Sequence, residues 1–193
     1  MLNAVISSGI FRGKKLTLPS LATTRSTKNL VKGSFFDTIR FKLSGRVFIE
    51  CFGGSGVMAL EALSNGAKAV IAIEKDKKAY EILKQNFIKI TGADFGENRA
   101  ILGDCFEKLP QCLSKSEDEI ILYFDPPFEI RRGFDGIYEK ILTLMANVSE
   151  FENVKMICIE HMSKIKIPSE IADFECIKMR KFGATSLSYL ERK

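Results

Sequence analysis

RVFIECFGGSGVMALEALSNGAKAVIAIE (residues 46–74) joins two short apolar runs through a glycine-rich turn and a helical pattern. The runs RVFIEC (46–51) and KAVIAIE (68–74) are typical of strands that are buried on both faces of a sheet. Between them, VMALEALSNG (57–66) is typical of a helix that Gly66 closes. A strand, helix and strand of this length predict two parallel strands joined by a crossover helix.

The same alternation continues toward the carboxyl terminus. The sequence predicts further strands over 98–103, 119–124 and 154–160, and helices over 78–90 and 135–148. The last two apolar runs, 174–182 and 185–192, are separated only by Gly183 and Ala184, which favours an antiparallel hairpin. We therefore predict an α/β, Rossmann-like fold, with a mostly parallel sheet covered by helices on both faces and a C-terminal antiparallel hairpin.

The first 45 residues differ from the rest in charge. AVIS (4–7) and KKLTL (14–18) predict short strands, and a helical pattern follows over 27–43. Residues 1–46 hold nine Lys and Arg against one acid, a net charge of +8, so the other 147 residues carry −3. We predict a basic N-terminal extension (1–45, a short hairpin plus a helix) before a main domain (46–193). Such an extension either meets a polyanion, with nucleic acid the first candidate, or is a solvated basic face.

Composition excludes several classes of protein. No apolar run reaches the roughly 18 residues that a membrane span needs, and the N-terminus does not have the pattern of a signal peptide. We therefore expect a cytoplasmic protein. The five cysteines form no CxxC pair, and His161 is the only histidine, which argues against a disulfide framework or a zinc site. No metal is expected.

Acidic and glycine residues follow the predicted strands where a parallel sheet binds its ligands, at the carboxyl ends. The first strand ends in ECFGGSG (50–56), whose glycines allow a ligand to approach the backbone closely. Glu74 ends the second strand, 24 residues after Glu50, and is placed to bind the hydroxyls of a ribose. Asp104 follows the third strand, where it could accept a hydrogen bond from an exocyclic amine or merely cap the next helix. Asp125 follows the fourth.

An adenosine-containing cofactor fits this pattern, and two kinds remain open. GSGVMA (54–59) matches the dinucleotide fingerprint, which alone is a weak signal and leaves an NAD-linked oxidoreductase as an alternative. A carboxylate at Glu50, however, repels a pyrophosphate and suits a cofactor that carries an ammonium and a sulfonium. That description favours S-adenosylmethionine.

Two motifs carry a family resemblance. ECFGGSG resembles the first motif of class I methyltransferases, and DPPF (125–128) is similar to the (D/N)PP(Y/F/W) motif of those that methylate exocyclic amines of bases. With GIFRGKKLTLP (9–19) and TRSTKNLVKGSFFDTI (24–39), nearly the whole chain resembles the RsmD-type family of bacterial 16S rRNA (guanine-N2)-methyltransferases. Ser26, Leu30 and Gly33 depart from that family's usual residues.

The resemblance implies a class I methyltransferase sheet, S-adenosyl-L-methionine as cofactor, and small-subunit ribosomal RNA or an assembling small subunit as partner. We also expect a monomer. The residues expected to bind the cofactor lie at or just after the ends of the first three predicted strands of the main domain. They are Glu50, Phe52, Gly53, Gly54, Ser55, Gly56, Glu74, Asp104 and Cys105.

The DPPF motif predicts a rigid clamp for an amine. Asp125 and the carbonyl of Pro126 would each accept one N–H, Pro127 would stiffen the backbone, and Phe128 would stack on the base. Phosphates would contact the basic residues of the extension and of the segment after DPPF: Arg12, Lys14, Lys15, Arg25, Lys28, Lys32, Arg131 and Arg132. An adenine-N6 methyltransferase and a non-catalytic RNA-binding protein remain alternatives.

Overall fold

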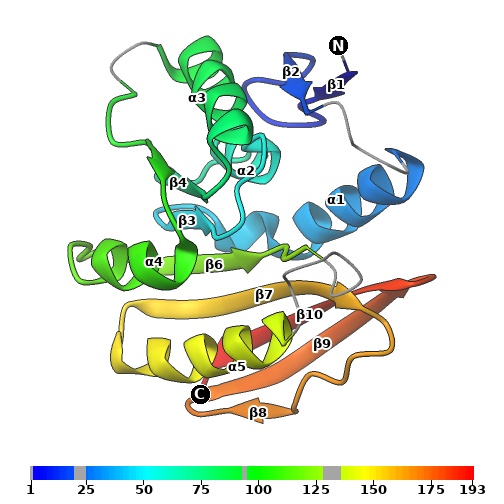
Figure 1. The fold of residues 1–193 in the computed structure, drawn as a ribbon, viewed down its shortest axis with the longest axis vertical. Helices are drawn as coiled ribbons and strands as arrows, with labels where there is room; N and C mark the ends of the chain where they lie inside the picture. Colours follow the sequence, from blue (N-terminus) through cyan, green and yellow to red (C-terminus); the bar gives the residue numbers. More distant parts are fainter. Residues whose placement is uncertain (1, 20–24, 93–94, 128–135) are drawn as a thin grey trace.

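The computed structural model describes residues 2–19, 25–92, 95–127 and 136–193. Its main sheet has eight strands in the order β5-β4-β3-β6-β7-β10-β9-β8, and a separate two-stranded sheet pairs β1 with β2 (Figure 1). The strands from β5 to β7 are parallel, and β10, β9 and β8 add antiparallel pairs. The structure thus confirms the predicted α/β sheet and its C-terminal hairpin.

The predicted elements lie close to their expected ranges, and β8 and two 3-10 turns were not predicted. The strands are β1 (Leu2–Val5), β2 (Lys15–Leu18), β3 (Val47–Glu50), β4 (Ala69–Glu74), β5 (Arg99–Leu102), β6 (Ile120–Phe124), β7 (Val154–Met162), β8 (Glu170–Ile171), β9 (Phe174–Phe182) and β10 (Thr185–Arg192). The helices are α1 (Arg25–Ile39), α2 (Val57–Ser64), α3 (Lys77–Thr91), α4 (Cys105–Leu113) and α5 (Ile137–Asn147), with 3-10 turns η1 (Arg40–Lys42) and η2 (Val148–Glu150). No helix in the described ranges is long and apolar enough to cross a membrane.

At the central strands β3, β4 and β6, both faces of the sheet are buried. On β3, Val47 and Ile49 pack with α4 and α5, whereas Phe48 packs with α1, α2 and α3. This follows from the alternation of side chains along a strand, and it explains why the strand sequences are apolar without interruption. Figure 1 shows α1, α2 and α3 grouped with the β1–β2 hairpin on one side of the sheet.

The sheet reverses its strand order between β3 and β6. The chain runs from β3 outward through β4 to β5, and then returns to β6 on the other side of β3. In the register of this central pair, Glu50 lies opposite Tyr123. The carboxyl ends of β3 and β6 therefore meet at a topological switch point, which is where open α/β sheets bind ligands.

The described part of the N-terminal extension packs onto this sheet. Leu16 of β2 and Phe35 of α1 are fully buried and belong to the same core cluster as Tyr123 of β6. The rings of Phe35 and Tyr123 have centroids 4.7 Å apart, and Phe35 also stacks on Tyr189 of β10 at 6.1 Å. The extension thus contributes to the main core, and a domain boundary at residue 46 stays a prediction.

Candidate active site

The glycine turn after β3 is packed on its inner side and open on its outer side. The amide of Gly53 donates to the carbonyl of Ile73 at 2.7 Å, and a Cβ on Gly53 would lie 2.8 Å from Leu83. Gly54 has φ +51°, and a Cβ there would meet no atom of the described chain within 4 Å. The turn therefore needs glycine for its fit against β4 and α3, and it leaves room beside Gly54 for a ligand.

Two further positions complete the turn. Gly56 is the N-cap of α2 at φ +74°, and a Cβ there would lie 2.9 Å from the ring of Phe87. Ser55 is buried, and its carbonyl accepts a hydrogen bond of 2.8 Å from the side chain of Asn86 in α3. Phe52 is half-buried and packs its ring 6.2 Å from that of Phe106. Each of these predicted cofactor-binding residues thus lies in the loop between β3 and α2.

Asn86 was not predicted from the sequence. Its side chain also exchanges two hydrogen bonds of 2.9 Å with the backbone of Thr17 in β2, so that it ties the glycine turn to the N-terminal hairpin. An asparagine on the buried face of an amphipathic helix was the available signal, because a buried amide needs partners for its donors and acceptor.

Glu74 reaches from the end of β4 to the glycine turn. One of its carboxylate oxygens accepts from the amide of Gly54 at 2.7 Å, and the other accepts from the amide of Asp76 at 2.6 Å. Each oxygen keeps a lone pair, so the half-buried carboxylate can still accept hydrogen bonds from a pair of ribose hydroxyls. The arrangement fits the ribose-binding role predicted for this residue.

Glu50 is a buried acid at the end of β3. Its side chain accepts a hydrogen bond of 3.0 Å from the amide of Ala59 in the first turn of α2. Burial raises the pKa of Glu50 to about 8, the amide of Ala59 opposes this rise, and the charges of Asp125 and Glu74 add to it. A bound cation would favour the ionised form, so this cluster of carboxylates suits the ammonium group of a cofactor such as S-adenosylmethionine.

The residues after β6 stand at the same edge of the sheet. Asp125 is half-buried and Pro126 is buried, and the charge of Asp125 acts on both Glu50 and Tyr123. Pro127 is half-buried. Asp125 and Glu50 therefore lie near enough to serve one site. Three further predicted residues lie outside the described residues: Phe128, Arg131 and Arg132.

A buried tyrosine and glutamate lie beneath Asp125, and the sequence did not predict them as a pair. The hydroxyl of Tyr123 donates to Glu160 at 3.0 Å, and burial, with the charges of Glu160 and Asp125, raises the pKa of Tyr123 well above its usual range. The adjacent His161 is buried 2.9 Å from the hydroxyl of Ser188, and burial lowers its pKa. Tyr123 and His161 are thus hydrogen-bonded side chains of the sheet's interior.

Asp104 caps α4. Its side chain accepts from the amide of Phe106 at 3.1 Å and pairs with Lys75 at 2.7 Å. Partial burial raises the pKa of Asp104, but the hydrogen bonds from Lys75 and Phe106 outweigh burial and lower the pKa overall. The capping alternative therefore describes Asp104 in this structure, and its contact with an amine stays a prediction.

Cys105 begins α4 and is buried, and burial raises the pKa of its thiol to about 12. A thiol of this kind is not a reactive nucleophile, so a contact with the cofactor would involve its backbone. Among the described residues, no three His, Cys, Asp or Glu side chains are arranged to hold a metal ion.

The six residues of the extension that were predicted to contact RNA fall into three groups, of which Lys32 alone forms the third. Arg12, Lys14 and Lys15 are exposed around the β1–β2 hairpin. Arg25 and Lys28 lie in the first turns of α1, but their side chains are outside the described part. These five residues stay candidates for phosphate contacts.

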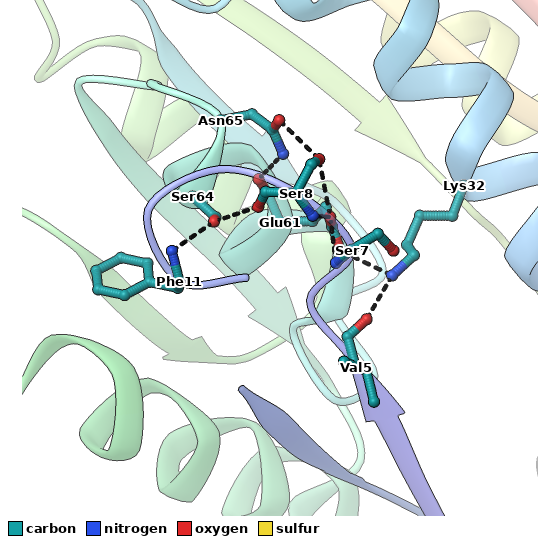
Figure 2. Close-up of polar contacts among 8 residues, drawn as sticks. All are labelled: Val5, Ser7, Ser8, Phe11, Lys32, Glu61, Ser64 and Asn65. Atoms are coloured by element: carbon teal, nitrogen blue, oxygen red, sulfur yellow. Dashed lines mark hydrogen bonds and ion pairs between the residues drawn. The ribbon is translucent and has the colours of Figure 1, made fainter. Parts of the chain in front are cut away.

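Lys32 does not fit the predicted role. It is only 5% exposed, and its ammonium group lies 2.7 Å from Glu61 and 2.8 Å from the carbonyl of Val5 (Figure 2). Sequence alone placed it with the other basic residues because the acid opposite it belongs to another helix. Lys32 is therefore removed from the RNA-contact set.

Glu61 of α2 anchors the N-terminal loop. It accepts hydrogen bonds from the amides of Ser7 at 2.8 Å and Ser8 at 3.1 Å, and Figure 2 shows these groups converging with Lys32 on its carboxylate. On the next turn, the hydroxyl of Ser64 accepts from the amide of Phe11 at 2.9 Å. Because α2 begins at the glycine turn, these bonds fix the basic loop relative to the candidate site.

Comparison with known proteins places the chain in a family. The family model described as Conserved hypothetical protein 95 matches residues 4–191. Ribosomal RNA small subunit methyltransferase D of Escherichia coli K12 is 26% identical over 188 residues, which cover 97% of this chain and 89% of that protein. The solved yhhF structure of Escherichia coli has a TM-score of 0.75 at 24% identity, over 100% of this chain and 99% of that one. SMU.776, solved in complex with SAH, has a TM-score of 0.62 at 12% identity, over 81% of this chain and 49% of that one.

Proposed function

Since this chain belongs to the family described as Conserved hypothetical protein 95, we propose that it is an S-adenosylmethionine-dependent methyltransferase of ribosomal RNA, acting on guanine N2 in the small subunit. One observation carries the proposal: the carboxylates of Glu50 and Glu74 and the Asp125–Pro126–Pro127 corner meet at one switch point of the sheet. The relatives named for methylation of small-subunit ribosomal RNA support the substrate class.

The cofactor would lie across the ends of β3 and β4. Glu50 would hold its ammonium group, Glu74 would accept from its ribose hydroxyls, and the open backbone at Gly54 would admit it closely. When bound, S-adenosylmethionine supplies an electrophilic methyl group on a positively charged sulfur. A pyrophosphate carries no positive charge that Glu50 could hold, which argues against the NAD alternative.

Asp125 and Pro126 would orient the acceptor amine. An exocyclic amine of a base has two N–H groups, and the carboxylate of Asp125 can accept one while the carbonyl of Pro126 accepts the other. The fixed φ of Pro126 and the following proline hold these acceptors in place, so that the amine is positioned rather than activated by a separate base. Phe128 would stack on the base, as its place in the DPPF motif implies.

Three measurements test the proposal. Calorimetry should show binding of S-adenosylhomocysteine, whereas binding of NAD alone would contradict the cofactor assignment. The purified protein should then transfer a labelled methyl group to small-subunit ribosomal RNA from cells that lack its gene. Nucleoside mass spectrometry should detect N2-methylguanosine; N6-methyladenosine would instead favour the adenine alternative, which the same clamp could serve.

A further inference from the structure

The pairing of β9 with β10 contains a β-bulge. Tyr189 pairs with Lys178, but the next residue, Leu190, pairs with Cys176, so that Ile177 is an extra residue on β9. A bulge of this kind interrupts the alternation of side chains and turns the following residues to the opposite face of the sheet.

The bulge changes which face the basic residues of β9 occupy. Before it, Phe174 and Cys176 pack into the core on the face that α4 and α5 cover. After it, Lys178 lies 3.4 Å from the hydroxyl of Thr38, and Arg180 donates to the hydroxyl of Ser34 at 2.8 Å. Ser34 and Thr38 belong to α1, so both cations lie on the α1 face.

Arg180 stands level with the candidate site. It shares Leu187 as a partner with Glu160 of β7, and the preceding residue of β7 pairs with Phe124 of β6. Since Asp125 directly follows Phe124, Arg180 and Asp125 lie at the same height on the carboxyl edge. They are three strands apart, about 14 Å at the usual strand spacing.

The two cations keep their charge available. Arg180 is exposed and Lys178 is half-buried, and their recorded hydrogen bonds go to hydroxyls of α1. In the described part of the chain, neither forms an ion pair with a carboxylate, whereas Arg192 on the neighbouring strand pairs with Asp173. Helix α1 begins at Arg25, and its end leads through η1 to the amino-terminal end of β3. Its basic first turns therefore lie toward the carboxyl edge of the sheet.

We propose that Lys178 and Arg180 bind backbone phosphates of the substrate RNA, on the side of the target base away from the N-terminal hairpin. The inference rests on the proposed function, since it assumes that the base enters at Asp125. A nucleic-acid strand carries a phosphate at each nucleotide, so cations about 14 Å from the base would meet phosphates a few nucleotides away. The bulge is the device that directs them there.

The test replaces both cations with glutamine. In the double variant Lys178→Gln/Arg180→Gln, the amides can still donate to Thr38 and Ser34, so that α1 stays anchored while two positive charges are lost. The affinity for small-subunit ribosomal RNA should fall about tenfold at physiological salt, and the slope of log K against log salt should lessen by about 1.4. At the same time, the affinity for S-adenosylhomocysteine should be unchanged, and Arg180→Lys should bind RNA nearly as the parent protein does.

A control removes the same charge elsewhere. Lys115→Gln/Lys155→Gln alters two lysines near the amino-terminal ends of β6 and β7, at the opposite edge of the sheet, and should leave the salt slope unchanged. Equal slopes for the parent and the Lys178/Arg180 variant, or an equal loss in the control, would overturn the inference. The experiment measures RNA binding and not methyl transfer. If the parent protein bound RNA without methylating it, the proposed function would be wrong, but the salt slopes would still show whether Lys178 and Arg180 contact phosphates.

Discussion

At the scale of single residues, the Glu50 carboxyl is held largely protonated at neutral pH, because its pKa is about 8. The principal cause is burial, and the nearby charges of Asp125 and Glu74 add to it. A cation bound beside this group would lower its pKa and favour the carboxylate. Binding of the cofactor should therefore be coupled to loss of a proton.

Calorimetry can measure that coupling. When S-adenosylhomocysteine binds at pH 7, we expect nearly one proton to be released, since Glu50 changes from mostly protonated to ionised. The released protons are counted by repeating the titration in buffers of different ionisation enthalpy. Glu50→Gln should bind more weakly and release almost none. Equal proton release by the two proteins would show that Glu50 does not bind the ammonium group.

Glu50 should also lower stability as the pH rises. Its pKa is raised on folding from 4.5 to about 8, so the folded state holds this proton more tightly, and the stability gained from it is present below pH 4.5 and lost toward pH 8. Glu50→Gln lacks this dependence. Its Tm should exceed that of the parent protein by an amount that grows between pH 5 and pH 8. The exposed Glu150→Gln is the matched control, and a difference in Tm that stays constant with pH would contradict the burial argument.

At the scale of elements, Gly33 lies inside α1, where glycine weakens a helix. A Cβ at Gly33 would meet nothing within 4 Å among the described atoms. Gly33→Ala should therefore raise the free energy of unfolding by about 0.5–1 kcal/mol in urea denaturation. Gly66→Ala is the control, because its surroundings are equally open but its φ is +100°, and it should destabilise instead. Destabilisation by both changes would mean that α1 depends on glycine at this position.

The Lys32–Glu61 pair attaches α1 to α2 and to the N-terminal loop. Lys32→Met would leave Glu61 buried without its cation, and we expect a loss of about 3–5 kcal/mol in the free energy of unfolding. Arg40→Met removes the partner of Asp37 from an exposed pair and should cost less than about 1 kcal/mol. Similar losses in the two variants would argue that the buried pair has no special part in holding the extension.

At the scale of the whole molecule, the parallel core was the most predictable part. Strands such as β3 and β6 are buried on both faces, so their sequences are apolar throughout and their ends coincide with the acids of the candidate site. That is why Glu50, Glu74 and Asp125 could be placed at one edge before the structure was known.

Features that depend on contacts between distant segments could not be predicted in this way. The burial of Lys32 follows from Glu61 on another helix, and a list of basic residues does not contain that information. The bulge at Ile177 follows from the register of two strands, which sequence patterns fix only to within a residue or so. The two-residue strand β8 is too short to have a pattern.

Asp125 is the residue on which the proposed function depends most, and single-turnover methyl transfer by Asp125→Ala measures its part in the reaction. The control is Asp118→Ala, which removes an acid that pairs with Lys68 just before β6, at the opposite edge of the sheet. If Asp125 holds the acceptor amine, its variant should bind S-adenosylhomocysteine almost as the parent does. Its rate of methyl transfer to RNA, however, should be lower than the parent rate by a factor of about 100 or more. Transfer at the parent rate, with cofactor binding intact, would contradict the account.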